Sequence, residues 1–424
     1  MGRTRRERSR KKPRKYCACD DSEDVVLLNS WLSKNGMKRN EKLGLAVFDD
    51  TGRGILTKKK IRAGEELINL PLNLTINVIT LLMDIPFCNI FLSNKKQCLL
   101  LYKQTISFQS LLAFYLTYLK SQEKNTKWFV YLESLPKEYT VPYFLPNEVK
   151  CSIDADILSV ISKQNDIIES SYTIFEDILK DGIIQHSNID NLKKSFTKSI
   201  YEWAYFTVNT RCVYMDLTKV IDMKNTEFVS KNVENINLKD IKEDLFSEVR
   251  FSIYTKNSFD PYTEVFICYG DSHNLKLITE YGFFLSDNEL DYVPFSFESV
   301  HKFLDTNSSK LSQDQISFIN SHGLNKDLYI DSRGLSYNFY GLLMVVKYYY
   351  NHGTDVSRLI YSAAICSTDK SLNDIVKPMI REKLENVQVS INKLKMLENQ
   401  CVILSNCVEL MCQYVCILEK FIKC

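Results

Sequence analysis

The sequence predicts an α+β protein with two clusters of short strands, a long helical insert between them and a helical region after them. Three observations carry this prediction. Strand-like segments separated by glycine turns occupy residues 43–71 and return at 249–269. Apolar residues elsewhere recur every three or four positions, as in amphipathic helices. Strands and helices do not alternate regularly, so neither a doubly wound parallel sheet nor a TIM barrel is expected.

The first strand cluster is predicted from three short apolar segments that follow a helix. The helix covers about 25–38 and ends at Gly36. The segments LGLAVF, ILTKKKI and LINLP come next, separated by the turns DDTGRG and RAGEE. Two hairpin-like units in so short a stretch indicate a small sheet.

The insert, about 76–205, is predicted to be helical from 107–120 and 152–180. Strand signals return in VRFSIYTKN and TEVFICYG, and helices are expected again from about 298 onward. The last of these helices carries an apolar stripe made of Ile380, Leu384, Val387, Ile391, Leu394 and Leu397. This stripe suits an antiparallel helical hairpin. A coiled-coil dimer is the alternative, but the stripe is short for one.

The composition is that of a globular chain with a basic N-terminal arm. Hydrophobic residues make up 45% of the chain and charged residues 25%, as in globular proteins. The length of 424 residues predicts two or three domains. The net charge is +2, whereas the first fifteen residues carry nine Lys or Arg and one Glu, which leaves the remainder at −6. We expect residues 1–20 to be a disordered arm, either a nuclear-import or nucleic-acid patch or a solvated tail. Nucleic acid contact is expected only through this arm.

Several classes of protein receive no support from the sequence. No run of about 18 apolar residues and no secretory signal is visible, so we expect no membrane contact and a cytoplasmic and nuclear location. The 13 cysteines include no CxxC pair and the histidines are scattered, so no metal site is predicted. HExxH, GxSxG and P-loop motifs are missing, which disfavours proteases, α/β-hydrolases and nucleotide hydrolases.

Three motifs are candidates for function. Gly52-Arg53-Gly54 allows a tight turn and close approach to a ligand, although an ordinary hairpin turn is the alternative. Arg211 follows an apolar, aromatic segment and needs an anionic partner, either a ligand carboxylate or an internal Asp or Glu. Tyr269 ends a predicted strand at a glycine turn, a position that taken alone is typical of core or interface residues.

Together and in this order, the motifs resemble the SET-domain methyltransferases. The resemblance is to the branch with the Rubisco large-subunit methyltransferase and SET domain-containing protein 4, and it covers about 40–424. The matching segments are GRGILTKKKIRAGEELINLP (52–71), WFVYLESLPKEYTVPYFLP (128–146), NTRCVY (209–214), EVFICYGDSHNLKLITEYGFFLSDN (264–288) and IDSRGLSYNFYG (330–341).

The resemblance implies a SET-type fold of small, knotted β-sheets with a large helical insert. The SET domain would span 38–290, with the insert at about 76–205. An all-α substrate-binding domain would follow at 291–424.

The activity implied by the resemblance is methyl transfer from S-adenosylmethionine to a lysine of a protein substrate, with a histone tail as a plausible target. The residues implied to line the cofactor are Gly52, Arg53, Gly54, Arg211, Tyr269, Tyr281, Gly282 and Phe283. Tyr269 would be the active-site tyrosine and Tyr281 would also border the lysine channel. Such chemistry needs no metal, because the sulfonium is an activated donor and the enzyme must mainly align a neutral amine with it.

One expected feature of the family is missing. Active members carry an Asn-His pair between the NTR and YG motifs, and residues 215–250 contain none. The pair Asn351-His352 falls in the tail and is interpreted as a helix cap. Either the segment has been lost, or a degenerate stretch fills the same space. A catalytically inactive SET-fold isoform that binds a peptide or partner is therefore the alternative function.

Overall fold

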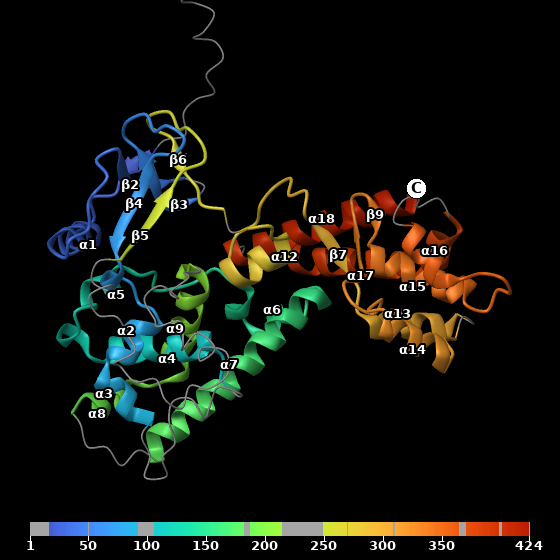
Figure 1. Cartoon of the computed structure of the whole chain (residues 1–424), viewed down its shortest axis with the longest axis horizontal. Coiled ribbons are helices and arrows are strands. Elements are labelled where there is room, and N and C mark those ends of the chain that lie inside the picture. The colour runs from blue at the N-terminus through green and yellow to red at the C-terminus, as the bar shows by residue number, and fades with distance from the viewer. Residues whose placement is uncertain are drawn as a thin grey trace, which may run out of the picture. The chain divides into compact units, whose positions relative to one another are not determined.

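The computed structural model describes residues 17–49, 51–91, 106–181, 187–213, 249–268, 270–307, 310–363, 370–397 and 401–423 (Figure 1). The chain divides into two compact units. Met1–Glu138 and Ile168–Tyr269 make up the first, and Tyr139–Ile167 and Gly270–Cys424 make up the second. This division differs from the domain boundaries expected from the sequence, because part of the predicted insert falls in the second unit.

The first unit contains two small antiparallel sheets. One has the strand order β1-β2-β3-β6 and the other pairs β4 with β5. The bounds are β1 (Cys17–Cys19), β2 (Leu43–Phe48), β3 (Gly52–Thr57), β4 (Glu66–Pro71), β5 (Arg250–Tyr254) and β6 (Glu264–Val265). Ala46, Phe48 and Leu56 form a buried cluster between β2 and β3. The strands predicted at 43–71 are therefore present, and each sheet joins them to a strand from 249–269.

Helices account for the rest of the first unit. They are α1 (Glu23–Lys34), η1 (Leu72–Leu74), α2 (Val78–Met83), α3 (Ile85–Cys88), η2 (Asn89–Phe91), α4 (Phe108–Ser121), η4 (Glu123–Asn125), α5 (Phe129–Ser134), α8 (Ser187–Ser195) and α9 (Lys198–Arg211). The long helix α7 (Ala155–Asp181) contributes its second half. Its Phe175 stacks on Phe114 of α4 with ring centroids 4.1 Å apart. The buried Tyr201 hydroxyl of α9 donates to Ser171 Oγ of α7 at 2.8 Å. Aromatic packing and this bond fix the helices that lead to the NTR motif.

The second unit is built around the helical pair α17 (Lys370–Lys395) and α18 (Val402–Lys423). Ile380, Val387, Ile391 and Leu394 of the predicted stripe are buried, which confirms that this helix has one apolar face turned to a core. The other helices are η5 (Pro142–Phe144), α6 (Asn147–Lys150), α12 (Asn274–Lys276), η8 (Leu277–Tyr281), α13 (Phe297–Thr306), α14 (Gln313–Ser321), α15 (Tyr337–Tyr348) and α16 (Val356–Ala363).

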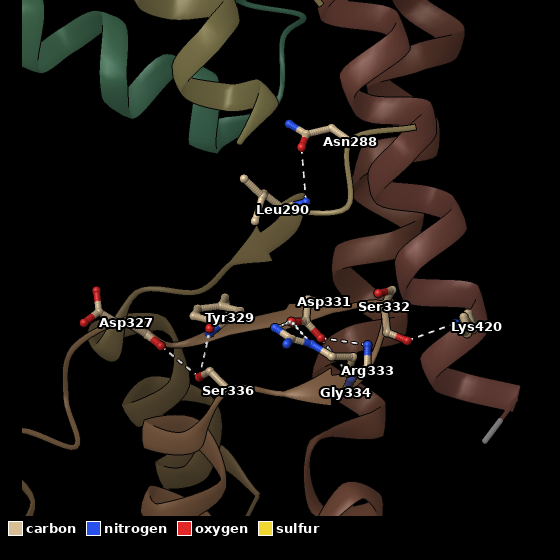
Figure 2. A network of polar contacts seen from close by, with 10 residues as sticks. All are labelled: Asn288, Leu290, Asp327, Tyr329, Asp331, Ser332, Arg333, Gly334, Ser336 and Lys420. Atoms are coloured by element: carbon tan, nitrogen blue, oxygen red, sulfur yellow. Dashed lines mark hydrogen bonds and ion pairs between the residues drawn. The ribbon is translucent and has the colours of Figure 1, made fainter. Parts of the chain in front are cut away.

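The prediction of an all-α region at 291–424 was wrong, because a three-stranded sheet lies within it. Its strands are β7 (Tyr292–Pro294), β8 (Tyr329–Asp331) and β9 (Gly334–Leu335). The β8–β9 turn is fixed by one carboxylate (Figure 2). Asp331 Oδ1 accepts from the backbone N–H groups of Arg333 and Gly334 at 2.7 and 3.2 Å, and its Oδ2 binds the Arg333 guanidinium. Lys420 of α18 donates to Ser332 O at 2.9 Å and anchors the turn on the helical pair.

Helix α18 is the one helix in the described ranges that is long and apolar enough to cross a membrane. Its buried residues Leu404, Cys407, Met411, Tyr414 and Leu418 recur every three or four positions. Helix α17 packs along it. This is the pattern of a core helix, which has the same length and apolar composition.

Candidate functional site

The two glycines of the first motif have different structural roles at the β2–β3 turn. Gly52 has φ +74°, and a Cβ placed there would meet no atom within 4 Å. A Cβ on Gly54 would stand 2.7 Å from Glu264 Oε1 and 3.1 Å from the Phe48 ring. Gly52 therefore allows a left-handed backbone beside open space, whereas Gly54 allows two side chains to pack against the main chain.

Arg53, between the two glycines, is engaged within the chain. Its Nε donates to Asp20 Oδ2 at 2.5 Å. The Asp20 side chain is only 6% exposed, and its Oδ1 accepts from the Ser22 N–H at 3.1 Å. Hydrogen bonds from Ser22 and Arg53 lower the pKa of Asp20. The Arg53 side chain thus points along the sheet to β1, so the main chain is the part of this residue left at the turn. No motif or spacing in the sequence marks Asp20 as a partner of this turn.

The third motif lies beside the first, because β6 pairs with β3. Val265 is opposite Ile55 and Glu264 is opposite Leu56. Thr51 Oγ1 donates to Glu264 Oε1 at 2.7 Å, which closes the β2–β3 turn against β6. The predicted strand 263–270 is shorter than expected, since only Glu264 and Val265 form the strand β6, although the Thr263 carbonyl also accepts from the Thr57 N–H of β3 at 2.9 Å. Phe266 and Ile267 are 66% and 56% exposed, and Tyr269 lies outside the described residues.

The second motif forms the last turn of α9. Thr210 Oγ1 donates to Phe206 O at 2.8 Å, and Asn209 Oδ1 accepts from Gln109 of α4 at 3.4 Å. Arg211 is exposed at the end of the helix, where a cation is favourable. Within the described ranges it makes no ion pair, so the internal Asp or Glu considered above is not found there. Residues 214–248, which hold most of the stretch without the Asn-His pair, lie outside the described residues.

Tyr281, Gly282 and Phe283 belong to the second unit and form a tightly packed turn after η8. Gly282 has φ +80°, and a Cβ there would lie 2.7 Å from the Thr140 carbonyl oxygen. Its own carbonyl accepts from Thr140 Oγ1 and from Asn406 of α18, each at 3.0 Å. The rings of Tyr281 and Phe283 are 6.5 Å apart and tilted. Gly282 is thus the point where three segments of this unit meet.

A buried amide and a buried carboxylate support this turn, and sequence reasoning missed both. Asn274 is fully buried; its backbone N–H and side-chain amide each donate to Asp291 at 2.6 Å. Its side-chain nitrogen also donates to the Leu285 carbonyl, and its side-chain oxygen accepts from the Leu285 N–H. Burial raises the pKa of Asp291, and the bonds from Asn274 oppose that shift. The segment after the YGF motif is therefore tied to the start of α12.

Among the described residues, no group of three or more His, Cys, Asp and Glu side chains could hold a metal ion. The motifs that can be placed fall in both units. Gly52, Arg53, Gly54 and Arg211 lie in the first, and Tyr281–Phe283 in the second. The structure brings the GRG turn together with the EVF strand, and it leaves Tyr269 undescribed.

The fold is that of a SET-domain methyltransferase. The structure of Rubisco LSMT bound to sinefungin and monomethyllysine covers 95% of this chain and 91% of its own, with a TM-score of 0.61 and 16% sequence identity. Among curated proteins, SET domain-containing protein 4 of Artemia parthenogenetica is 25% identical over 392 residues, which are 88% of this chain and 92% of the relative. Ribosomal lysine N-methyltransferase set11 of Schizosaccharomyces pombe is 25% identical over 323 residues, 73% of this chain and 71% of the relative. No family model matches the chain.

These similarities confirm the resemblance to the branch of SET domain-containing protein 4 and the Rubisco enzyme. They do not test the knot, the domain boundaries or the roles of individual site residues, which stay predictions.

Proposed function

We propose that this chain is an S-adenosylmethionine-dependent protein methyltransferase that modifies a lysine side chain. The observation that carries the proposal is the pairing of β3 with β6, because it joins the two motif segments that the resemblance assigns to one site. Support also comes from the similar proteins. One of them is named for lysine methylation of ribosomal protein, and another was solved with sinefungin and monomethyllysine.

We assign Gly52, Arg53 and Arg211 to the methionine end of S-adenosylmethionine. The open side of Gly52 leaves room for a ligand against the backbone. Arg211 offers a guanidinium that is not neutralised by a described residue, and a carboxylate is its natural partner. Because Asp20 holds the Arg53 side chain, Arg53 would contribute its main chain alone. When bound, the cofactor supplies a methyl group on a sulfonium that is already activated for transfer.

The remaining roles follow from the chemistry of the amine. A free lysine has a pKa near 10.4, so the site must favour the neutral form. Tyr281 and Phe283 would do this by removing the amine from water, and their rings would also attract a methylammonium group. The Tyr269 hydroxyl would orient the nitrogen lone pair toward the methyl group. Alignment of the two reactants would then provide most of the rate.

The proposal extends to substrate and location. A histone tail is the proposed substrate class, and the basic arm of residues 1–15 is the proposed nuclear-import signal. Fluorescence microscopy of the full chain and of a chain without residues 1–15 tests the location. Equal nuclear and cytoplasmic distribution of the two proteins would refute the role of the arm.

Isothermal calorimetry of the full chain with S-adenosylmethionine is the decisive measurement, and we expect micromolar binding. Arg211→Ala should weaken that binding about tenfold or more, because it removes a charge-assisted hydrogen bond. Arg381→Ala removes an exposed arginine from α17 and is the matched control. Equal affinity of the Arg211 and Arg381 variants would make Arg211 structural. A chain that melts cooperatively but does not bind would be the inactive, partner-binding form.

Tyr269→Phe should lower kcat about a hundredfold with little change in cofactor affinity, because the hydroxyl is proposed to act on the amine in the transition state. The assay is methyl transfer to core histones, read by mass spectrometry. Tyr361→Phe changes an exposed tyrosine of α16 and controls for the substitution itself. Undiminished transfer by Tyr269→Phe would remove the residue from the active site.

A further inference from the structure

We propose that Asp20 is a positioning residue of the cofactor site: by holding Arg53 across the edge of the sheet, it fixes the conformation of the GRG turn. The part of this inference that concerns cofactor affinity rests on the proposed function. The part that concerns the turn rests on the geometry of the first unit alone.

The register of the sheet explains how the two residues meet. Ala18 on β1, Val47 on β2 and Arg53 on β3 lie directly opposite one another, so their side chains share one face. Neighbouring strands are about 4.8 Å apart, and Arg53 reaches over β2 to the end of β1. The ladder of β1 continues to Asp20, whose N–H donates to Leu45 O at 3.0 Å. Both ends of the ion pair are therefore anchored on the same sheet.

The ion pair is shielded from solvent on the Asp20 side, whereas the Arg53 side chain is 43% exposed. Its carboxylate is nearly buried and accepts bonds from a guanidinium and from a backbone N–H. The neighbouring Asp21 is exposed and has no partner among the described residues. Asp20 thus holds Arg53 and Ser22 from a nearly buried position, whereas Asp21 is exposed and holds neither, so Asp21 serves as the neighbouring control.

The GRG residues Gly52, Arg53 and Gly54 are paired with Phe48, Val47 and Ala46 of β2. Gly52 has no side chain and open space beside its Cα, and it is the first residue of β3, where the pairing with β2 begins after the turn. Besides that pairing, Thr51 makes one hydrogen bond to Glu264. Anchoring Arg53 removes conformations of the turn that could not accept a ligand. A turn held in this way costs less to order on binding, so affinity should depend on Asp20.

The first experiment measures the turn itself, by amide hydrogen exchange of the full chain without ligand. In Asp20→Asn, the amides of residues 52–55 should exchange about tenfold faster than in the wild type, and in Asp21→Asn they should be unchanged. Equal protection in all three proteins would overturn the proposal. This outcome does not depend on whether the chain binds S-adenosylmethionine.

The second experiment measures function, by calorimetry with sinefungin and by methyl-transfer kinetics. Asp20→Asn should raise the Kd and the KM for the cofactor about three- to tenfold, with kcat nearly unchanged. Asp20→Glu should recover part of the affinity, and Asp20→Asn combined with Arg53→Gln should be no worse than either alone. Additive losses would contradict a shared role. If wild type binds no cofactor, the proposed function fails while hydrogen exchange still decides the inference.

Discussion

The GRG turn and the YGF turn both contain a glycine in the left-handed region, yet their surroundings are opposite. Gly52 has φ +74° with open space beside it, and the adjacent Arg53 is held by an ion pair to Asp20, which follows β1. Gly282 has φ +80° and presses against the Thr140 backbone, and its carbonyl accepts two hydrogen bonds. The GRG turn is fixed by the Arg53 side chain beside an open space. The YGF turn is fixed by packing of its main chain against that of Thr140. Substitutions should therefore affect ligand binding at the first and stability at the second.

The largest expected effect is that of Gly282→Ala. The new Cβ would overlap the Thr140 carbonyl, and the residue would also be held in a conformation that disfavours alanine. We expect a loss of about 3 kcal/mol or more in the free energy of unfolding, measured by urea denaturation of the full chain. Gly353→Ala is the control, since it has φ +83° but meets nothing within 4 Å, and it should cost about 1 kcal/mol. Equal losses would show that strain and not packing dominates.

At the GRG turn, Gly54→Ala should cost about 1–3 kcal/mol, less than Gly282→Ala, because the groups in the way are side chains that can move. These groups are the Glu264 carboxylate and the Phe48 ring. Glu264→Ala should relieve part of the loss, as measured by the same denaturation series. Gly52→Ala should cost about 1 kcal/mol in stability but weaken cofactor binding more than Gly54→Ala does. The reverse order of affinities would show that Gly52 does not face the ligand.

Local sequence patterns predicted the strands and helices that show a clear periodicity of apolar residues. The alternation of LGLAVF corresponds to β2, where Ala46 and Phe48 are buried and Val47 is exposed, and the helical spacing of 107–120 corresponds to α4, whose residues 112–119 are all buried. The sheet β7-β8-β9 was missed, since strands of two or three residues are too short to show alternation. The Asp20–Arg53 pair was missed because it depends on the register of three strands. Tyr269 and the stretch without an Asn-His pair remain predictions from sequence.

The smallest expected effect is a change of stability with pH, which should involve the segment around His273 in the second unit and not the GRG turn in the first. Burial, with a contribution from Lys276, lowers the pKa of His273 below its ordinary value of 6.5. Its ring lies 4.5 Å from that of Tyr292 in the second unit, and its Nδ1 is buried without a hydrogen-bond partner in the described ranges. As pH falls through 6.5, the unfolded chain binds a proton that the folded chain does not, so stability should fall.

Thermal unfolding of wild type and His273→Gln between pH 7.5 and 5.5 tests this. The difference between the two proteins should change by no more than about 1 kcal/mol, with wild type losing more toward pH 5.5. Burial raises the pKa of Asp291, which makes the folded protein more stable as the pH falls. The test therefore uses the difference in stability between wild type and His273→Gln, not the wild-type curve alone.

The pKa of Asp20 is lowered, so its ion pair with Arg53 should persist until the pH falls below the ordinary aspartate value of 3.8. Hydrogen exchange at pH 5.5 should therefore show residues 52–55 protected as at pH 7.5, while the segment around His273 opens more often. Parallel loss of protection in both segments would mean that the two turns do not respond to pH independently.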